Sequence, residues 1–166
     1  MGTFDLEAEP TSIDCQLADV SKDAGFSFTG TFSRLRGERD AWLTLSGVSR
    51  PALFDGQVVV SQQTAARLFP ECGCAGRTAL QETLTVALLS KSQDRELQGA
   101  CPSRPLDGGL PPPDGGVALP GTTDEGFDAV RACGELLDVL QVEPDAGCAA
   151  SCASCSMLYR VDGVRR

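Results

Sequence analysis

Apolar and polar residues alternate with a period of two in several segments of the N-terminal half. The clearest is residues 26–32, where three phenylalanines and Gly30 alternate with serines and threonines. Because side chains on a strand point alternately to its two faces, this pattern predicts a strand with one buried face. Residues 4–9, 42–46 and 83–88 alternate in the same way. Short strands with one apolar face each favour an antiparallel sheet.

Turn residues separate these segments. Residues 37–40 and Asp55-Gly56 predict tight turns, and Pro10 is expected to end the first strand. Residues 1–99 are therefore predicted to form an antiparallel β-meander. Such a sheet must cover its apolar face, so it can close into a small barrel, pack on a second sheet or accept a helix.

The composition changes after Leu97. Residues 101–126 contain six prolines and six glycines, a composition typical of a loop without a core of its own. We expect a Pro/Gly-rich linker over residues 100–122, inserted within one domain.

Residues 123–141 are predicted to form a C-terminal helix. Thr122 and Glu125 have the spacing of a capping box. The apolar residues that recur at helical spacing are Phe127, Val130, Cys133, Leu137 and Leu140.

Residues 142–166 are expected to hold a Cys-rich segment and the last strand. Met157, Tyr159 and Val161 share one face of that strand. The simplest use of this strand is to return and pair with a strand of the meander, which makes residues 1–166 a single domain.

The chain has eight cysteines and no histidine. An even number of cysteines spread over the whole chain favours a disulfide framework formed in an oxidising compartment. The sequence does not fix the pairing. We expect Cys133 to pair with one of the last three cysteines and Cys101 to hold one end of the linker. The cysteines are Cys15, Cys72, Cys74, Cys101, Cys133, Cys148, Cys152 and Cys155.

Two other uses of the cysteines are weaker. The spacing of Cys148, Cys152 and Cys155 matches the iron–sulfur motif of radical-SAM enzymes, but the large α/β barrel that such enzymes need is not predicted. Cys72 and Cys74 could instead join Cys152 and Cys155 in a four-thiolate zinc site. Cys72 and Cys74 lie in one glycine-rich turn, so as disulfide partners they are expected to reach different cysteines.

Charge and composition exclude several classes of function. The net charge of −9 disfavours nucleic acid and anionic lipid as partners. The absence of histidine excludes Ser-His-Asp and Cys-His catalysis, and no glycine-rich phosphate loop is present. No apolar run is long enough for a membrane-spanning helix. We therefore assign no catalytic residue, no cofactor and no metal.

Three segments carry a resemblance to a known group: Gly2-Thr3-Phe4, residues 28–32 (Phe-Thr-Gly-Thr-Phe) and the Cys-rich tail ending in residues 159–164. They resemble uncharacterised secreted lipoproteins of GC-rich Gram-negative bacteria. The resemblance implies an envelope or extracellular address and supplies no activity and no site residues. Because the N-terminus lacks a basic stretch followed by an apolar one, we expect the export signal, with any lipid anchor of the precursor, to lie outside this chain.

The expected function is that of a non-enzymatic structural or binding module of the periplasm, outer-membrane surface or cell exterior. Its partner would be another envelope or surface protein, or a glycan. One alternative is a carrier that holds a small lipid-like ligand inside a β-barrel, although a barrel of about six strands leaves little room beyond its own side chains. The second alternative is the thiolate zinc site. The phenylalanines expected on the inner face are Phe4, Phe26, Phe28, Phe32 and Phe54.

Overall fold

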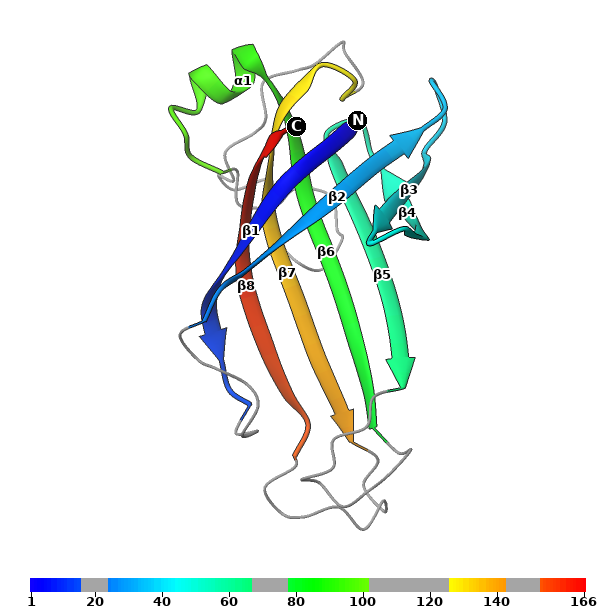
Figure 1. Ribbon diagram of the computed structural model, residues 1–166, viewed down its shortest axis with the longest axis vertical. Helices are drawn as coiled ribbons and strands as arrows, with labels where there is room; N and C mark the ends of the chain where they lie inside the picture. The colour runs from blue at the N-terminus through cyan, green and yellow to red at the C-terminus, as the bar shows by residue number, and fades with distance from the viewer. Residues whose placement is uncertain (16–23, 67–77, 102–125, 143–152) are drawn as a thin grey trace, which may run out of the picture.

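The computed structural model describes residues 1–15, 24–66, 78–101, 126–142 and 153–166. Eight antiparallel strands form a closed barrel in which each strand pairs with its neighbours in sequence order (Figure 1). This confirms the mainly β, antiparallel fold and its closure into a barrel. The strands are β1 (Gly2–Ile13), β2 (Phe26–Arg34), β3 (Asp40–Leu45), β4 (Val48–Phe54), β5 (Val58–Ala66), β6 (Thr78–Ser90), β7 (Ala129–Val142) and β8 (Cys155–Arg165).

The last strand closes the barrel, as predicted. β8 pairs with β1 on one side, where Phe4 lies opposite Arg165, and with β7 on the other, where Leu136 lies opposite Tyr159. The two chain ends therefore meet at the same end of the barrel (Figure 1).

The inner face of the barrel follows the predicted period of two. On β1, Phe4, Leu6 and Ala8 are buried, while Asp5 and Glu7 are exposed. The rings of Phe4 and Phe32 pack edge to face, with centroids 5.8 Å apart. The core continues around the barrel through Leu43, Phe54, Val59, Leu84, Val86, Leu88, Leu136 and Val161.

The predicted C-terminal helix is wrong. Residues 129–142 form β7, a strand of 14 residues that pairs with β6 and β8 on its two sides. The buried residues Ala132, Leu136 and Leu140 are four positions apart. That spacing suits one face of a helix and equally one face of a strand, because four is a multiple of two. The expected cap, at Thr122 and Glu125, lies outside the described residues.

A short helix occurs elsewhere. α1 (Lys91–Glu96) follows β6 and begins with a capping box in which Ser90 and Gln93 exchange hydrogen bonds. Close to the helix, Leu97 and Cys101 pack against a small apolar cluster on the outer barrel wall that includes Leu89. No helix in the described part of the chain has the length and apolar character needed to cross a bilayer.

β1 does not end at Pro10. The strand continues to Ile13, with an irregularity in its pairing to β8 between Pro10 and Ser12. Pairing with β2 ends earlier, at Ala8 and Phe26. Pro10 has no amide hydrogen to donate, but at this position β1 is no longer paired with β2. The strand therefore tolerates the proline.

All four cysteines in the described residues are paired. Cys15 is bonded to Cys155, and Cys101 to Cys133, with Cα–Cα distances of 5.0 and 5.8 Å. Cys101 thus holds one end of the linker, as expected. The expectation that Cys133 bonds a C-terminal cysteine is wrong, because Cys133 lies on the outer face of β7 beside Cys101.

The other predictions about cysteines and the linker fall outside the described residues. These predictions concern Cys72, Cys74, Cys148, Cys152 and most of the linker at 100–122.

Candidate functional site

The strands close into a barrel, but among the described residues its wall is incomplete along part of one side. β3 and β4 are short: β2 pairs with β3 only through residues 30–34, and β4 pairs with β5 only at Leu53–Val60 and Phe54–Val59. Figure 1 shows the β3–β4 hairpin confined to one end of the barrel, while β5, β6, β7 and β8 run on to the other. We call the gap between residues 26–29 of β2 and residues 62–66 of β5 the open side.

Alternation of hydrogen bonds shows which groups of β5 face the open side. The amide of Leu88 donates to the carbonyl of Gln57 at 3.1 Å, which places the odd-numbered residues of β5 in hydrogen-bonded pairs with β6. In an antiparallel ladder the intervening residues direct both backbone groups the other way. Gln62, Thr64 and Ala66 therefore present N–H and C=O groups to the open side.

The same reasoning applies to β2. The amide of Arg166 donates to the carbonyl of Thr3 at 2.9 Å, so odd-numbered residues of this part of β1 bond toward β8 and even-numbered residues toward β2. Leu6 thus bonds Phe28. Ser27 and Thr29 are left with backbone groups directed at the open side.

Side-chain exposure confirms that the gap reaches the barrel interior. Gln63 and Ala65 share the inward-facing parity of the buried Val59, yet both are exposed. Phe26 also points inward and is 43% exposed. Its ring packs 5.8 Å from that of Phe28, between ring centroids. At the open side, inward-facing side chains are therefore exposed, and two aromatic rings lie along its β2 edge.

Tyr159 of β8 extends this aromatic cluster across the interior. Its ring centroid lies 5.3 Å from that of Phe26, and its hydroxyl is 3.8 Å from the sulfur of Met157. Burial, and to a lesser degree the negative charge of Asp138, raise the pKa of Tyr159 above its ordinary value. The hydroxyl is therefore a neutral group at physiological pH.

Charged groups lie just inside the open side. Arg50 of β4 is only 7% exposed and forms an ion pair with Glu82 of β6. Glu82 lies opposite Gln63 and, on its other side, opposite Asp138. The Nε of Arg50 is buried and has no hydrogen-bond acceptor among the described groups. Because buried charges are costly unless they are paired, this ion pair is a defined polar centre on the inner face of the barrel.

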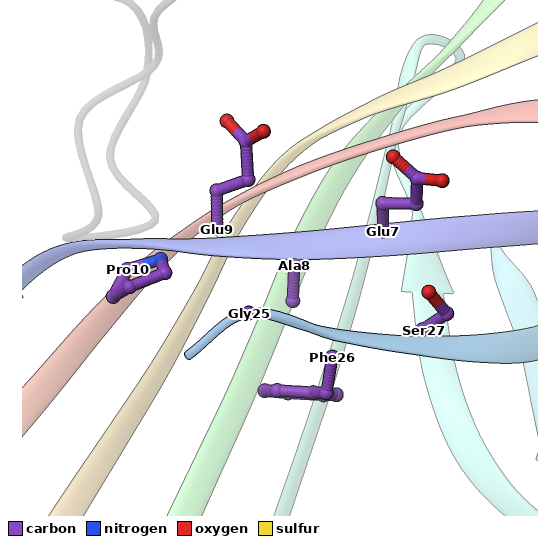
Figure 2. Close-up of a pocket in the computed structure, with 7 residues that line it drawn as sticks. All are labelled: Glu7, Ala8, Glu9, Pro10, Gly25, Phe26 and Ser27. Carbon is purple, nitrogen blue, oxygen red and sulfur yellow. The ribbon is translucent and has the colours of Figure 1, made fainter. Parts of the chain in front are cut away.

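A shallow hollow lies along the free end of the β1–β2 ladder (Figure 2). It has a volume of about 550 Å³ and is open to solvent. Glu7 and Glu9 point to one side of the ladder, and Ala8 and Phe26 to the other (Figure 2). Glu9 is paired with Arg160. None of the hollow's lining residues belongs to a cluster of metal-binding side chains among the described residues, so we assign it no chemistry. Its remaining lining residues are Pro10, Gly25 and Ser27.

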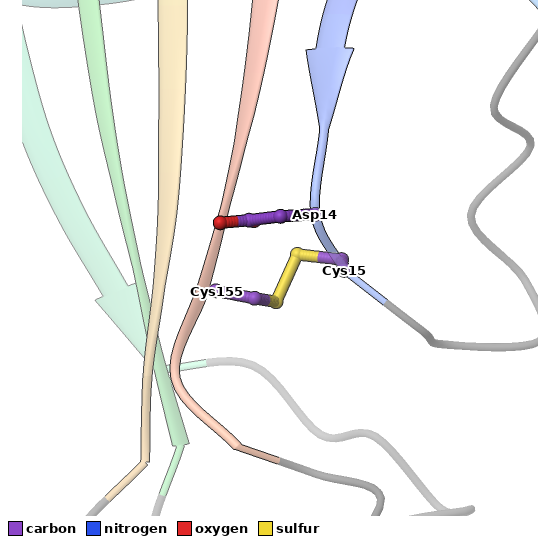
Figure 3. A group of neighbouring side chains, drawn as sticks. All are labelled: Asp14, Cys15 and Cys155. Carbon is purple, nitrogen blue, oxygen red and sulfur yellow. A yellow bond between two sulfur atoms is a disulfide. The ribbon is translucent and has the colours of Figure 1, made fainter.

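Asp14, Cys15 and Cys155 bring their side-chain ligand atoms within 4.8 Å of one another (Figure 3). The two sulfurs are bonded to each other, and the carboxylate of Asp14 accepts hydrogen bonds from the backbone amide and hydroxyl of Ser156. The disulfide and these hydrogen bonds therefore link the end of β1 to the start of β8. The bond also occupies one of the four thiolates of the expected zinc site.

An apolar patch lies on the outer face of the β3–β4 hairpin. Trp42, the only tryptophan of the chain, is 50% exposed and lies opposite Pro51. Leu53, which lies opposite Asp40 on the same hairpin, and Leu35, which directly follows β2, are also exposed. We call these four residues the hairpin patch.

Sequence reasoning missed both the patch and the open side. The alternation with Leu43 and Leu45 does place Trp42 on the outer face, so an exposed tryptophan could have been anticipated. Ser46 and Gly47 have φ values of 49° and 81° and form a two-residue turn. Recognising that turn predicts that β3 and β4 are short, which is the origin of the gap.

Comparisons of the chain with models of protein families, with curated proteins and with solved structures find no match. A functional assignment therefore depends on the geometry of the open side and the hairpin patch.

Proposed function

We propose that this chain is a non-enzymatic binding module of the bacterial envelope or cell surface, and that its partner is another protein that docks on the hairpin patch. The observation that carries the proposal is the half-exposed Trp42, which lies opposite Pro51 in that patch. Folded proteins seldom leave several large apolar side chains together in water without a use for them. Tryptophan is also enriched among the residues that dominate binding energy at protein interfaces.

The exposed apolar side chains near Trp42 favour a protein over a glycan as the partner. The side chains of Leu35, Pro51 and Leu53 offer no hydrogen bond to sugar hydroxyls, whereas they suit the apolar centre of a protein interface. The polar neighbours of Trp42 are Ser33, which lies opposite it on β2, and Asp40 and Thr44, which share its face of β3. In a protein interface these residues would belong to the polar rim.

The packing of the barrel gives less support to the alternative of a lipid-like carrier. Phe4, Phe32 and Phe54 fill the interior at the end that holds the chain termini. At the open side the interior contains the Arg50–Glu82 ion pair, which an apolar ligand would leave desolvated.

Two disulfides support the envelope or extracellular address. They join residues 140 and 32 positions apart, and such bonds persist mainly in oxidising compartments. A structural role for the chain in the envelope is compatible with the same docking surface.

Site-specific photo-crosslinking in the source organism tests the proposal. A photo-crosslinking amino acid replaces Leu53 in the patch or, as the control, Val164 on β8. The two side chains are matched in exposure, at 62% and 64%. We expect one protein to be linked through position 53 and not through position 164.

A second variant shows whether the patch itself is recognised. Trp42→Ala should lower the yield at position 53 by at least about tenfold, because truncating a central aromatic residue typically costs more than 1.4 kcal/mol of binding energy. Equal products from both positions, a cross-linked glycan, or full yield with Trp42→Ala would each refute the proposal.

A further inference from the structure

We infer that the open side binds a β-hairpin of a partner protein, which pairs with the free edges of β2 and β5 and completes the barrel wall. This inference goes beyond the proposed function, because it concerns a different surface and a different mode of recognition. It is drawn from the backbone groups of the two edges, the directions of the two strands and the residues that they carry.

The two edges lack the features that normally keep a free strand edge from pairing. Natural edges are blocked by prolines, charged side chains or bulges. Elsewhere in this barrel prolines do so: Pro10 lies beyond the last β2 partner of β1, and Pro51 lies where β4 separates from β5. Residues 26–29 (Phe-Ser-Phe-Thr) and 62–66 (Gln-Gln-Thr-Ala-Ala) contain neither proline nor charge.

The geometry of the gap selects two strands rather than one. β2 and β5 run in opposite directions, because each strand of the barrel is antiparallel to the next. A single added strand would be antiparallel to one edge and parallel to the other. A hairpin is antiparallel to both, and the β3–β4 hairpin already fills the same interval between β2 and β5 at the other end of the barrel.

The side chains at the edges indicate the chemistry of the partner hairpin. The arm beside β2 would place its inward residues next to Phe26 and Phe28, which favours apolar or aromatic groups there. The arm beside β5 would meet Gln63 and Ala65, which favours small or amide side chains. Beyond Gln63 lies Glu82, which is already paired with Arg50, so a charged group on that arm is disfavoured.

Other occupants fit less well. The chain's own segment 102–125 contains six prolines, which have no amide to donate to a ladder. A second copy of the chain presents the same two edges, but in that copy they lie on either side of its own gap. Two strands that fill the gap must instead lie next to each other and be free on their outer edges, as the arms of a hairpin are.

Cross-linking from both edges of the oxidised full-length chain tests the inference. Photo-crosslinking amino acids replace Thr29 on β2 and Thr64 on β5, and the attached peptides are sequenced by mass spectrometry. We expect both positions to link to one partner protein, at two sites a few residues either side of a turn in its sequence. Links to one uninterrupted strand, to this chain itself or to a second copy of it, or the absence of any link, would overturn the inference.

A matched pair of variants separates backbone pairing from side-chain contact. Thr64→Pro removes the amide that faces the gap, whereas Thr64→Val keeps it and has almost the same shape. We expect Thr64→Pro to lower the yield from Thr29 by at least about tenfold and Thr64→Val to leave it within about twofold. Equal yields from the two variants would contradict recognition through the backbone.

Hydrogen exchange gives an independent result. In the purified complex the amides of Ser27, Thr29, Gln62 and Thr64 should exchange at least about tenfold more slowly than in the free chain, while that of Gln63 should not change. The two proposals fail separately. Loss of links at position 53 with retained links at positions 29 and 64 contradicts the docking patch alone, and the reverse contradicts this inference alone.

Discussion

The two sides of this barrel differ in what holds them together. On the closed side, β6, β7 and β8 are each paired along both edges over nine or more residues, and the inner face is packed with buried apolar side chains. On the open side, β2 and β5 each have one partner among the described residues over half their length, and inward-facing residues such as Gln63 are exposed. The same barrel thus has one side that is paired and packed throughout and one side that is only partly paired.

From this difference we expect the closed side to determine the stability of the fold and the open side to take part in recognition. The closed side buries enough apolar surface to define the fold, so the open side is free to keep exposed backbone donors and acceptors. Both proposed binding surfaces lie beside the short β3–β4 hairpin: the patch on its outer face and the open side beyond its tip. A change that affects folding and one that affects binding should therefore lie in different places.

The largest expected contrast is between two phenylalanines. Phe4→Ala on the closed side should lower the free energy of unfolding by about 3–5 kcal/mol, because it leaves a cavity in a packed core. Phe26→Ala, at the edge of the open side, should cost about 1 kcal/mol, since its side chain is already 43% exposed. Denaturant unfolding of the oxidised protein measures both. Similar losses for the two variants would show that the open side is packed as tightly as the closed one.

Two neighbouring prolines on β5 provide the next contrast. Gln63→Pro removes an amide that pairs with β6 and should cost on the order of 3 kcal/mol. Thr64→Pro removes an amide that faces the gap and should cost less than about 1 kcal/mol. The same unfolding measurement applies. If Thr64→Pro were the more damaging of the two, the assignment of the free backbone groups would be reversed.

The alternation of apolar and polar residues was sufficient to predict those strands that bury a single face. The alternation around Phe4, Leu6 and Ala8 predicted the buried face of β1, and the tail around Tyr159 predicted the strand that closes the barrel. The same rule was not decisive for β7, where buried residues four positions apart fit either a helix or a strand. Pairing with β6 and β8 settles the matter by bonding the backbone on both edges, and that information lies outside the segment itself.

The open side could be anticipated only in part. The Ser46-Gly47 turn limits the length of β3 and β4, and this signal is present in the sequence. The separation of β4 from β5 depends on tertiary packing. The two strands pair only at Leu53–Val60 and Phe54–Val59, and next to these pairs the contact continues through the side chain of Ser61, which donates a hydrogen bond of 2.9 Å to the carbonyl of Pro51. The Cys101–Cys133 disulfide could not be predicted from the sequence either. It requires Cys133 to lie on the outer face of a strand, whereas residues 123–141 were predicted to form a helix.

The smallest expected effect concerns a carboxylate on the closed side. Glu135 points outward from β7, between Thr85 of β6 and Arg160 of β8, and burial by this wall raises its pKa above the ordinary value of 4.5. The folded state therefore disfavours the charged form. The group stabilises the fold most when protonated, below its unfolded pKa, and that contribution is lost as the pH rises through the folded pKa.

Glu135→Gln should therefore make the protein slightly more stable than the wild type at pH 7, and the difference should vanish below about pH 4. Thermal unfolding across this pH range measures the effect. The control is Glu38→Gln in the exposed β2–β3 turn, which should remain within about 0.5 kcal/mol of the wild type. A Glu135→Gln protein that is less stable at pH 7 would mean that attraction to Arg160 outweighs burial. The closed side would then stabilise the charged carboxylate of Glu135 despite its burial.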